Sequence, residues 1–91
     1  MTTDLSADDV RDAVFTKAPM GKRGYEPKSV HDLLQLAARR LDGRGYLDAD
    51  HVRSATFRTA PRLQRGYDKA EVDAFVARVA EAIEAIEALD A

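Results

Sequence analysis

The apolar residues of this chain recur at intervals of three and four positions in four segments, a spacing typical of helices with one buried face. Two of the segments are short, at roughly residues 6–15 and 48–57. The first of them has a narrow apolar stripe formed by Val10, Val14 and Phe15. Both follow polar residues that can accept hydrogen bonds from the free N–H groups of a helix start, namely Asp4 and Ser6 in the first and Asp48 and Asp50 in the second. The pattern predicts two short, capped helices.

Two longer segments carry apolar seams of several turns. The first seam consists of Val30, Leu33, Leu34, Ala37 and Leu41. The second continues for about five turns and predicts a coiled-coil-like helix over about residues 69–89, about 31 Å long. Its members are Val72, Phe75, Val76, Val79, Ile83, Ile86 and Leu89. No strand-like alternation occurs in the sequence, so the predicted fold class is all-α.

Proline and glycine residues separate the predicted helices. Pro19 and Gly21 interrupt the chain after the first short helix, and Pro61 does so after the second. Gly43 and Gly45 end the first long helix and form the linker to the second half.

The two halves are copies of one unit of 42 residues. A shift of 42 positions aligns residues 5–41 with 47–83 without a gap, and 14 of the 37 pairs are identical. The identical pairs are Leu5/Leu47, Ala7/Ala49, Asp8/Asp50, Val10/Val52, Arg11/Arg53, Ala13/Ala55, Phe15/Phe57, Ala18/Ala60, Pro19/Pro61, Arg23/Arg65, Gly24/Gly66, Tyr25/Tyr67, Val30/Val72 and Ala38/Ala80. We therefore expect two tandem helical hairpins, residues 1–45 and 46–91, that fold together as one compact domain.

Helix lengths constrain how the hairpins sit together. In each unit the chain runs along a short helix, turns at a loop and returns along a longer helix, so both loops are predicted at the same end of a pseudo-twofold bundle. The last helix should extend past the rest by about two turns. Its apolar seam, Val72 to Leu89 as given above, is predicted to be a partner interface.

The repeated Gly-Tyr pair and the repeated phenylalanines suggest a structural role at the loops. Gly24 and Gly66 are expected to adopt a backbone conformation that other residues disfavour, which turns Tyr25 and Tyr67 inward. The tyrosines and the equivalent phenylalanines then form a hydrophobic cluster between loop and long helix.

Composition narrows the class of protein. The 91 residues are 45% apolar and 33% charged, with a net charge of −2, which fits a soluble helical domain. The sequence has no cysteine, no signal-peptide pattern at MTTDLSADDV and no apolar run long enough to span a bilayer, so a cytoplasmic protein is expected. Basic residues concentrate in the two loops and acidic residues in the helices.

The second unit reads LDADHVRSATFRTAPRLQRGYDKAEVDAFVARV, and the first reads LSADDVRDAVFTKAPMGKRGYEPKSVHDLLQLA. Both units resemble the lipid-binding module of the DivIVA family. The shared features are a short helix ending in Phe, a loop ending in Arg-Gly-Tyr and a helix opening with Val-Asp-x-Phe. FTKAPMGKRGY is close to the loop of actinobacterial members. The first unit departs from the helix motif, reading Val30-His31-Asp32-Leu33, and this chain has two modules where the family usually has one before a long coiled coil.

The resemblance implies a scaffold of bacterial cell division or polar growth, peripheral on the inner face of the membrane at septum or poles. Implied partners are a second copy, other DivIVA-type coiled-coil or division proteins, and an anionic membrane surface. The positions matching the family's membrane-binding loop are Met20, Lys22, Arg23, Arg62, Leu63 and Arg65. Two alternatives stay open: Arg23 and Arg65 can instead pair with Glu26, Asp68 and Glu71 to fix the turn, and Met20 and Leu63 can instead pack in the core.

Other function classes have little support in the sequence. The serines lack a nucleophile motif, and His31 and His51 lack metal-ligand spacing, so neither catalytic residues nor metal or cofactor sites are predicted. A small helical nucleic-acid-binding or regulatory protein is the alternative, disfavoured because many of the basic residues fall in loops and the longest helix is acidic. A third interpretation is an adaptor that pairs with a longer DivIVA-type coiled coil through its last helix.

Overall fold

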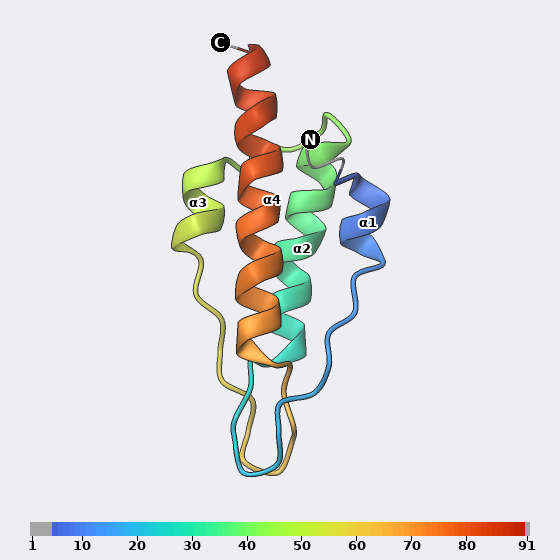
Figure 1. Cartoon of the computed structure of the whole chain (residues 1–91). Coiled ribbons are helices and arrows are strands. Elements are labelled where there is room, and N and C mark those ends of the chain that lie inside the picture. The colour runs from blue at the N-terminus through green and yellow to red at the C-terminus, as the bar shows by residue number, and fades with distance from the viewer. Residues whose placement is uncertain (1–4, 91) are drawn as a thin grey trace.

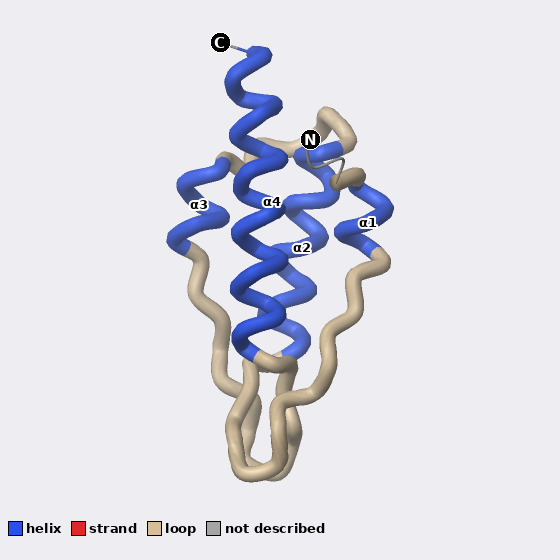
Figure 2. The backbone as a smooth tube through the Cα atoms, viewed as in Figure 1, coloured by secondary structure: helices blue, strands red, loops and turns tan. Residues whose placement is uncertain are grey.

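The computed structural model describes residues 5–90 and contains four α-helices in that range (Figure 1). In chain order they are α1 (Ala7–Arg11), α2 (Pro27–Leu41), α3 (Ala49–Ser54) and α4 (Lys69–Asp90). No strand occurs among the described residues, although isolated antiparallel bridges join the loops (Figure 2). The all-α prediction is confirmed, and so is the long last helix.

Side-chain caps begin both short helices. The Ser6 hydroxyl accepts a hydrogen bond from Asp9 N at 3.1 Å, and the Asp9 carboxylate accepts one from Ser6 N at 3.0 Å, which together form a capping box. The Asp48 carboxylate accepts from His51 N at 2.7 Å. Asp50 lies inside the first turn of α3 rather than at its cap, and the other predicted cap, Asp4, lies outside the described residues.

The core lies between the two long helices. Helix α1 packs on α2, α3 packs on α4, and α2 packs on α4 (Figure 1). Small and β-branched residues at equivalent repeat positions fill the contact, so that Val10, Val52, Val30 and Val72 are all 1% exposed or less. The buried residues that form this core cluster are Ala7, Val10, Val30, Leu34, Ala37, Ala38, Ala49, Val52, Val72, Val76, Val79, Ala80 and Ile83. Both repeats therefore contribute to a single core.

Both short helices end earlier than the sequence pattern predicts, at Arg11 and Ser54. Val14, which the pattern places on the buried stripe, lies beyond α1 and is strongly exposed, so that assignment is corrected. The cause is tertiary, because the chain after α1 extends until Ala18 N donates to Gly66 O at 2.7 Å. A helix of five or six residues has little stability of its own, so the loop pairing decides where it stops.

The two loops between short and long helices, residues 16–26 and 58–68, interlock at one end of the molecule, which we call the loop end (Figure 1). Tyr25 and Tyr67 exchange backbone hydrogen bonds of 3.0 and 2.9 Å. On either side, Ala18 N donates to Gly66 O and Ala60 N donates to Gly24 O, the same contact shifted by 42 residues in both partners. Each loop thus completes the hydrogen bonding of the other.

Glycine stands at the equivalent positions 24 and 66 of the two units for a different reason from the one expected. Neither residue is among the glycines with positive φ, which are Gly21, Gly43 and Gly45. A Cβ on Gly24 would instead lie 2.7 Å from the carbonyl carbon of Gly66 and closer still to the carbonyl oxygen of Tyr67. A Cβ on Gly66 would lie 2.6 Å from the carbonyl carbon of Gly24. The expectation of an unusual backbone conformation is wrong. Glycine is required at these positions because the two backbones approach each other too closely for a side chain.

Burial also corrects much of the predicted partner seam on α4. Val72, Val76, Val79 and Ile83 lie in the chain's own core, and Phe75 is half-buried against it, because α2 and α3 already cover this face. The seam becomes accessible toward the C-terminal end of α4, which extends past α2 (Figure 1) and still contacts α3 through Glu84 with Arg53 and Glu87 with Ala49 N. Ile86 is half-buried there and Leu89 is exposed.

Candidate functional site

The loop end presents two exposed apolar side chains at its turns. Each turn closes with a backbone hydrogen bond, Lys22 N to Pro19 O at 3.0 Å and Gln64 N to Pro61 O at 2.9 Å. Met20 is 83% exposed and Leu63 is 98% exposed. The core-packing alternative for these two residues therefore does not hold. Both side chains are open to solvent at the turns of the two loops.

Four basic side chains at the loop end have no ion-pair or hydrogen-bond partner among the described residues. They are Lys17, Lys22, Arg58 and Arg62, all exposed. The sequence had indicated Lys22 and Arg62 but not Lys17 and Arg58, which lie on the incoming arms of the loops. A signal was available in the sequence, because each of the two loops carries more basic than acidic residues. Unpaired cations beside exposed apolar residues leave the loop end suited to an anionic, partly apolar surface.

Arg23 and Arg65 have a structural role in the loops. Arg23 donates from Nε and Nη2 to Ala60 O at 3.2 and 3.0 Å, and Arg65 donates in the same way to Ala18 O at 3.0 and 2.8 Å. These acceptors are backbone carbonyls of the other repeat rather than the acids Glu26, Asp68 and Glu71. Each guanidinium thus fixes the opposite loop while its charge stays at the loop end.

Aromatic pairs between the repeats support the loops from the helix side. The rings of Phe15 and Tyr67 lie 5.2 Å apart, and those of Phe57 and Tyr25 lie 5.1 Å apart. The Tyr25 hydroxyl donates to Asp73 Oδ1 at 2.8 Å, and burial together with this bond raises the pKa of Tyr25. The predicted aromatic cluster is present, and its pairs cross from one repeat to the other.

Polar contacts between loop and long helix also cross between repeats. The Tyr67 hydroxyl lies 2.8 Å from Nε2 of His31, at the position equivalent to Asp73. Thr16 donates to Glu71 from both its N–H and its hydroxyl, and Arg58 N donates to the Ser29 hydroxyl at 3.2 Å. The loop end is therefore a fixed platform built from both repeats.

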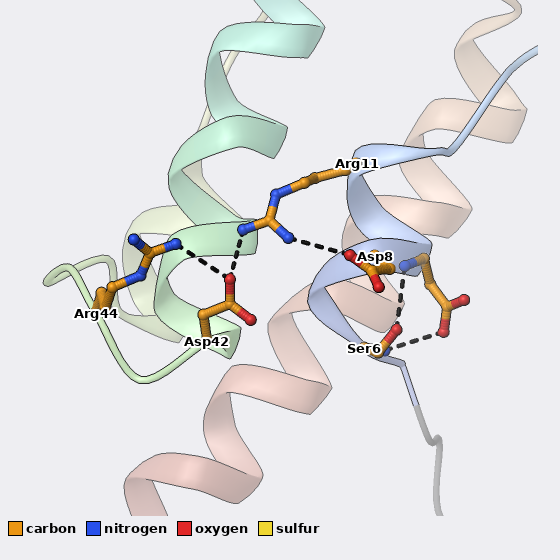
Figure 3. A network of polar contacts seen from close by, with 6 residues as sticks. Ser6, Asp8, Arg11, Asp42 and Arg44 are labelled. Atoms are coloured by element: carbon orange, nitrogen blue, oxygen red, sulfur yellow. Dashed lines mark hydrogen bonds and ion pairs between the residues drawn. The ribbon is translucent and has the colours of Figure 1, made fainter.

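Ion pairs hold the short helices to the long ones at the opposite end. Arg11 donates to both Asp42 and Asp8, and Arg44 donates to Asp42 at 3.2 Å (Figure 3). The Arg11 hydrogen bond is the main reason that the pKa of Asp42 is lowered. The equivalent pair in the second repeat is Arg53 with Glu84, at 2.8 Å.

No group of three or more metal-ligating side chains occurs in the part of the chain that the structure describes. His51 Nδ1 lies 2.7 Å from the Asp48 carboxylate at the cap of α3, and His31 contacts Tyr67 as described above. Within residues 5–90 the structure contains no helix with both the length and the apolar character needed to cross a bilayer. A comparison of this chain with models of protein families, with curated proteins and with solved structures finds no match.

Proposed function

We propose that this chain is a non-enzymatic scaffold or adaptor of bacterial cell division or polar growth that docks through its loop end on an anionic membrane surface. The main supporting observation is the combination of exposed Met20 and Leu63 with four unpaired cations on a platform fixed by both repeats. The resemblance of both units to the DivIVA membrane-binding module supports the same proposal.

The physical chemistry of an anionic bilayer fits this surface. A basic residue close to an anionic leaflet contributes on the order of 1 kcal/mol of binding free energy. Met20 and Leu63 add apolar burial in the interface between head groups and acyl chains. Because Arg23 and Arg65 hold the loops in place, little conformational entropy is lost when the loop end docks. The protein would then be peripheral on the inner face of the membrane.

Co-sedimentation with liposomes tests the proposal. The chain should bind vesicles that contain an anionic phospholipid at low salt and should not bind neutral vesicles. Replacing Lys22 and Arg62 together by Ala should weaken binding about 30-fold, since two charges contribute on the order of 2 kcal/mol. Replacing Arg44 and Arg78 by Ala removes the same charge away from the loop end and should change binding little. Absence of wild-type binding at low salt would contradict the proposal.

The same cations could bind nucleic acid, and the apolar tip separates the two functions. Replacing Met20 and Leu63 together by Ala should weaken liposome binding, because insertion of these side chains is lost. Binding to nucleic acid would depend on the cations and salt but not on these two residues. An electrophoretic shift that survives this double change, together with no liposome binding, would favour nucleic acid.

A further inference from the structure

The first unit has a recess of about 430 Å³ between α1 and α2, which we call the polar recess. Its lining residues are Arg11, His31, Leu34, Gln35 and Arg39. His31, Gln35 and Arg39 are spaced four positions apart on α2, so they form a row along one face of the helix. Nε2 of His31 contacts the Tyr67 hydroxyl, so only Nδ1 of this ring is open to a ligand. The polar side chains of the lining can all donate hydrogen bonds and none is a carboxylate, which suits a ligand that accepts them.

Arg39 determines the sign of the charge at the polar recess. Its side chain is exposed and has no ion-pair or hydrogen-bond partner among the described residues. Arg11 is already engaged by Asp8 and Asp42, and Arg44 shares Asp42, so these four charges cancel. An anionic group that binds Arg39 therefore meets a net positive charge and breaks no contact of the chain.

A second recess, which we call the apolar recess, lies where α2 meets the linker to α3, at the end opposite the loop end (Figure 1). It also has a volume of about 430 Å³, and its lining residues are Leu36, Arg39, Gly45, Tyr46 and Leu47. Leu36 is 49% exposed and Tyr46 is fully exposed. Arg39 lines both recesses, so a ligand that lies across this residue contacts hydrogen-bond donors on one side and apolar side chains on the other.

The repeat shows that the fold does not require these side chains. In the second unit, the positions equivalent to the polar row and to Leu36 are occupied by Asp73, Ala77, Arg78 and Glu81. A carboxylate thus replaces both His31 and Arg39, and a cation replaces Leu36. All four residues are exposed on α4, which packs into the same core as α2. The donors and the apolar surface are therefore properties of the first unit alone, and packing within the chain does not account for them.

We propose that the two recesses together bind an acidic, extended segment of a partner protein. A carboxylate of the segment pairs with Arg39, and an apolar side chain next to it packs between Leu36 and Tyr46. From His31 to Arg39 the helix rises about 12 Å, the length of about four residues of an extended chain. A single free cation beside an apolar surface fits such a peptide better than a nucleic acid, whose backbone needs several cations. The proposal does not depend on what the loop end binds.

Titration of the 15N-labelled full chain with a four-residue probe, acetyl-Leu-Glu-Glu-Leu-amide, tests the proposal by amide chemical shifts. Shifts of residues 31–39 and 45–47 should saturate with a dissociation constant of about 0.1 to 1 mM, as expected for a short peptide. The uncharged probe acetyl-Leu-Gln-Gln-Leu-amide should bind at least about fivefold more weakly, because it cannot form the ion pair. No saturable shift from the acidic probe up to about 5 mM, or equal binding of both probes, overturns the proposal.

Two variants and a matched control locate the contact. Arg39→Glu copies the equivalent residue Glu81 and should weaken binding of the acidic probe about tenfold or more, and Leu36→Ala should weaken it about threefold. Arg78→Glu makes the same change of charge on α4, away from both recesses, and should leave the dissociation constant unchanged. An equal loss in Arg39→Glu and Arg78→Glu would show attraction by overall charge and contradict the proposal. Shifts of residues 31–47 that follow protein concentration without the probe, or that a single-stranded oligonucleotide produces more strongly, would also contradict it.

Discussion

Gly24 and Gly66 mark the point where the two backbones of the loop end cross. The outgoing arms lie so close that a single Cβ on either glycine would overlap main-chain atoms of the other arm. Backbone atoms cannot move aside like the end of a flexible side chain, and Tyr25 and Tyr67 next to them form the central pair of hydrogen bonds. Glycine has a hydrogen atom where alanine has a methyl group, and this difference lets the two arms approach closely enough to interlock.

Alanine substitutions distinguish close approach from backbone strain at these glycines. Gly24→Ala should lower the free energy of unfolding by more than about 3 kcal/mol, because the crossing must open. Gly21→Ala is the control: Gly21 has a φ of 85° but nothing lies within 4 Å of its added Cβ. That change should cost about 1 to 2 kcal/mol from conformational strain alone. Urea denaturation measures both, and a larger loss for Gly21→Ala would contradict this explanation.

At the scale of elements, the short helices depend on contacts that local sequence does not encode. α1 and α3 are five and six residues long, too short to be stable in isolation. Their buried Val10 and Val52 pack on the long helices, and Arg11 and Arg53 pair with carboxylates on those helices. The ion pairs are exposed and set the position of the short helices more than they stabilise the fold.

The Arg11–Asp42 pair predicts a specific acid sensitivity. Because Arg11 lowers the pKa of Asp42 in the folded state, the stability from this pair is present above the unfolded pKa of about 3.9 and is lost as pH falls through the lower folded-state value. The wild type should therefore lose stability between about pH 5 and pH 2. The Asp42→Asn variant should lose less stability over that pH interval, as measured by thermal denaturation. Asp12→Asn, which removes an exposed carboxylate outside this pair, should lose as much as the wild type.

Much of the fold follows from the sequence because helical periodicity and the repeat are both explicit in it. The long helices, the caps Ser6 and Asp48 and the extension of α4 beyond α2 are confirmed. Helix ends and loop geometry could not be predicted, because they depend on hydrogen bonds between residues about 50 positions apart, such as Ala18 with Gly66. The seam of α4 shows the same limit: periodicity identifies its apolar face but not whether α2 or another chain covers it.

At the scale of the whole molecule, the two units complete each other. Backbone pairing, the arginine contacts of Arg23 and Arg65, and the aromatic pairs all cross between the repeats. The core likewise takes residues from α2 of one unit and α4 of the other. In a single unit the backbone groups of the loop would have no hydrogen-bond partners, and one apolar face of the long helix would be exposed to water. Both the unmade hydrogen bonds and the exposed apolar surface would lower the stability of the unit.

Separating the repeats tests this interdependence. Residues 1–45 and 46–91, produced as two polypeptides, should each lack most of the helical signal of the intact chain at low micromolar concentration, because neither has a closed core. Mixing them at equal concentration should restore the far-UV circular dichroism spectrum as the interlocked loops and the α2–α4 contact re-form. The restored signal should weaken on dilution, whereas that of the intact chain should not. If either half is fully helical as a monomer by sedimentation velocity, the two units are independent domains and the interlocking is not required for folding.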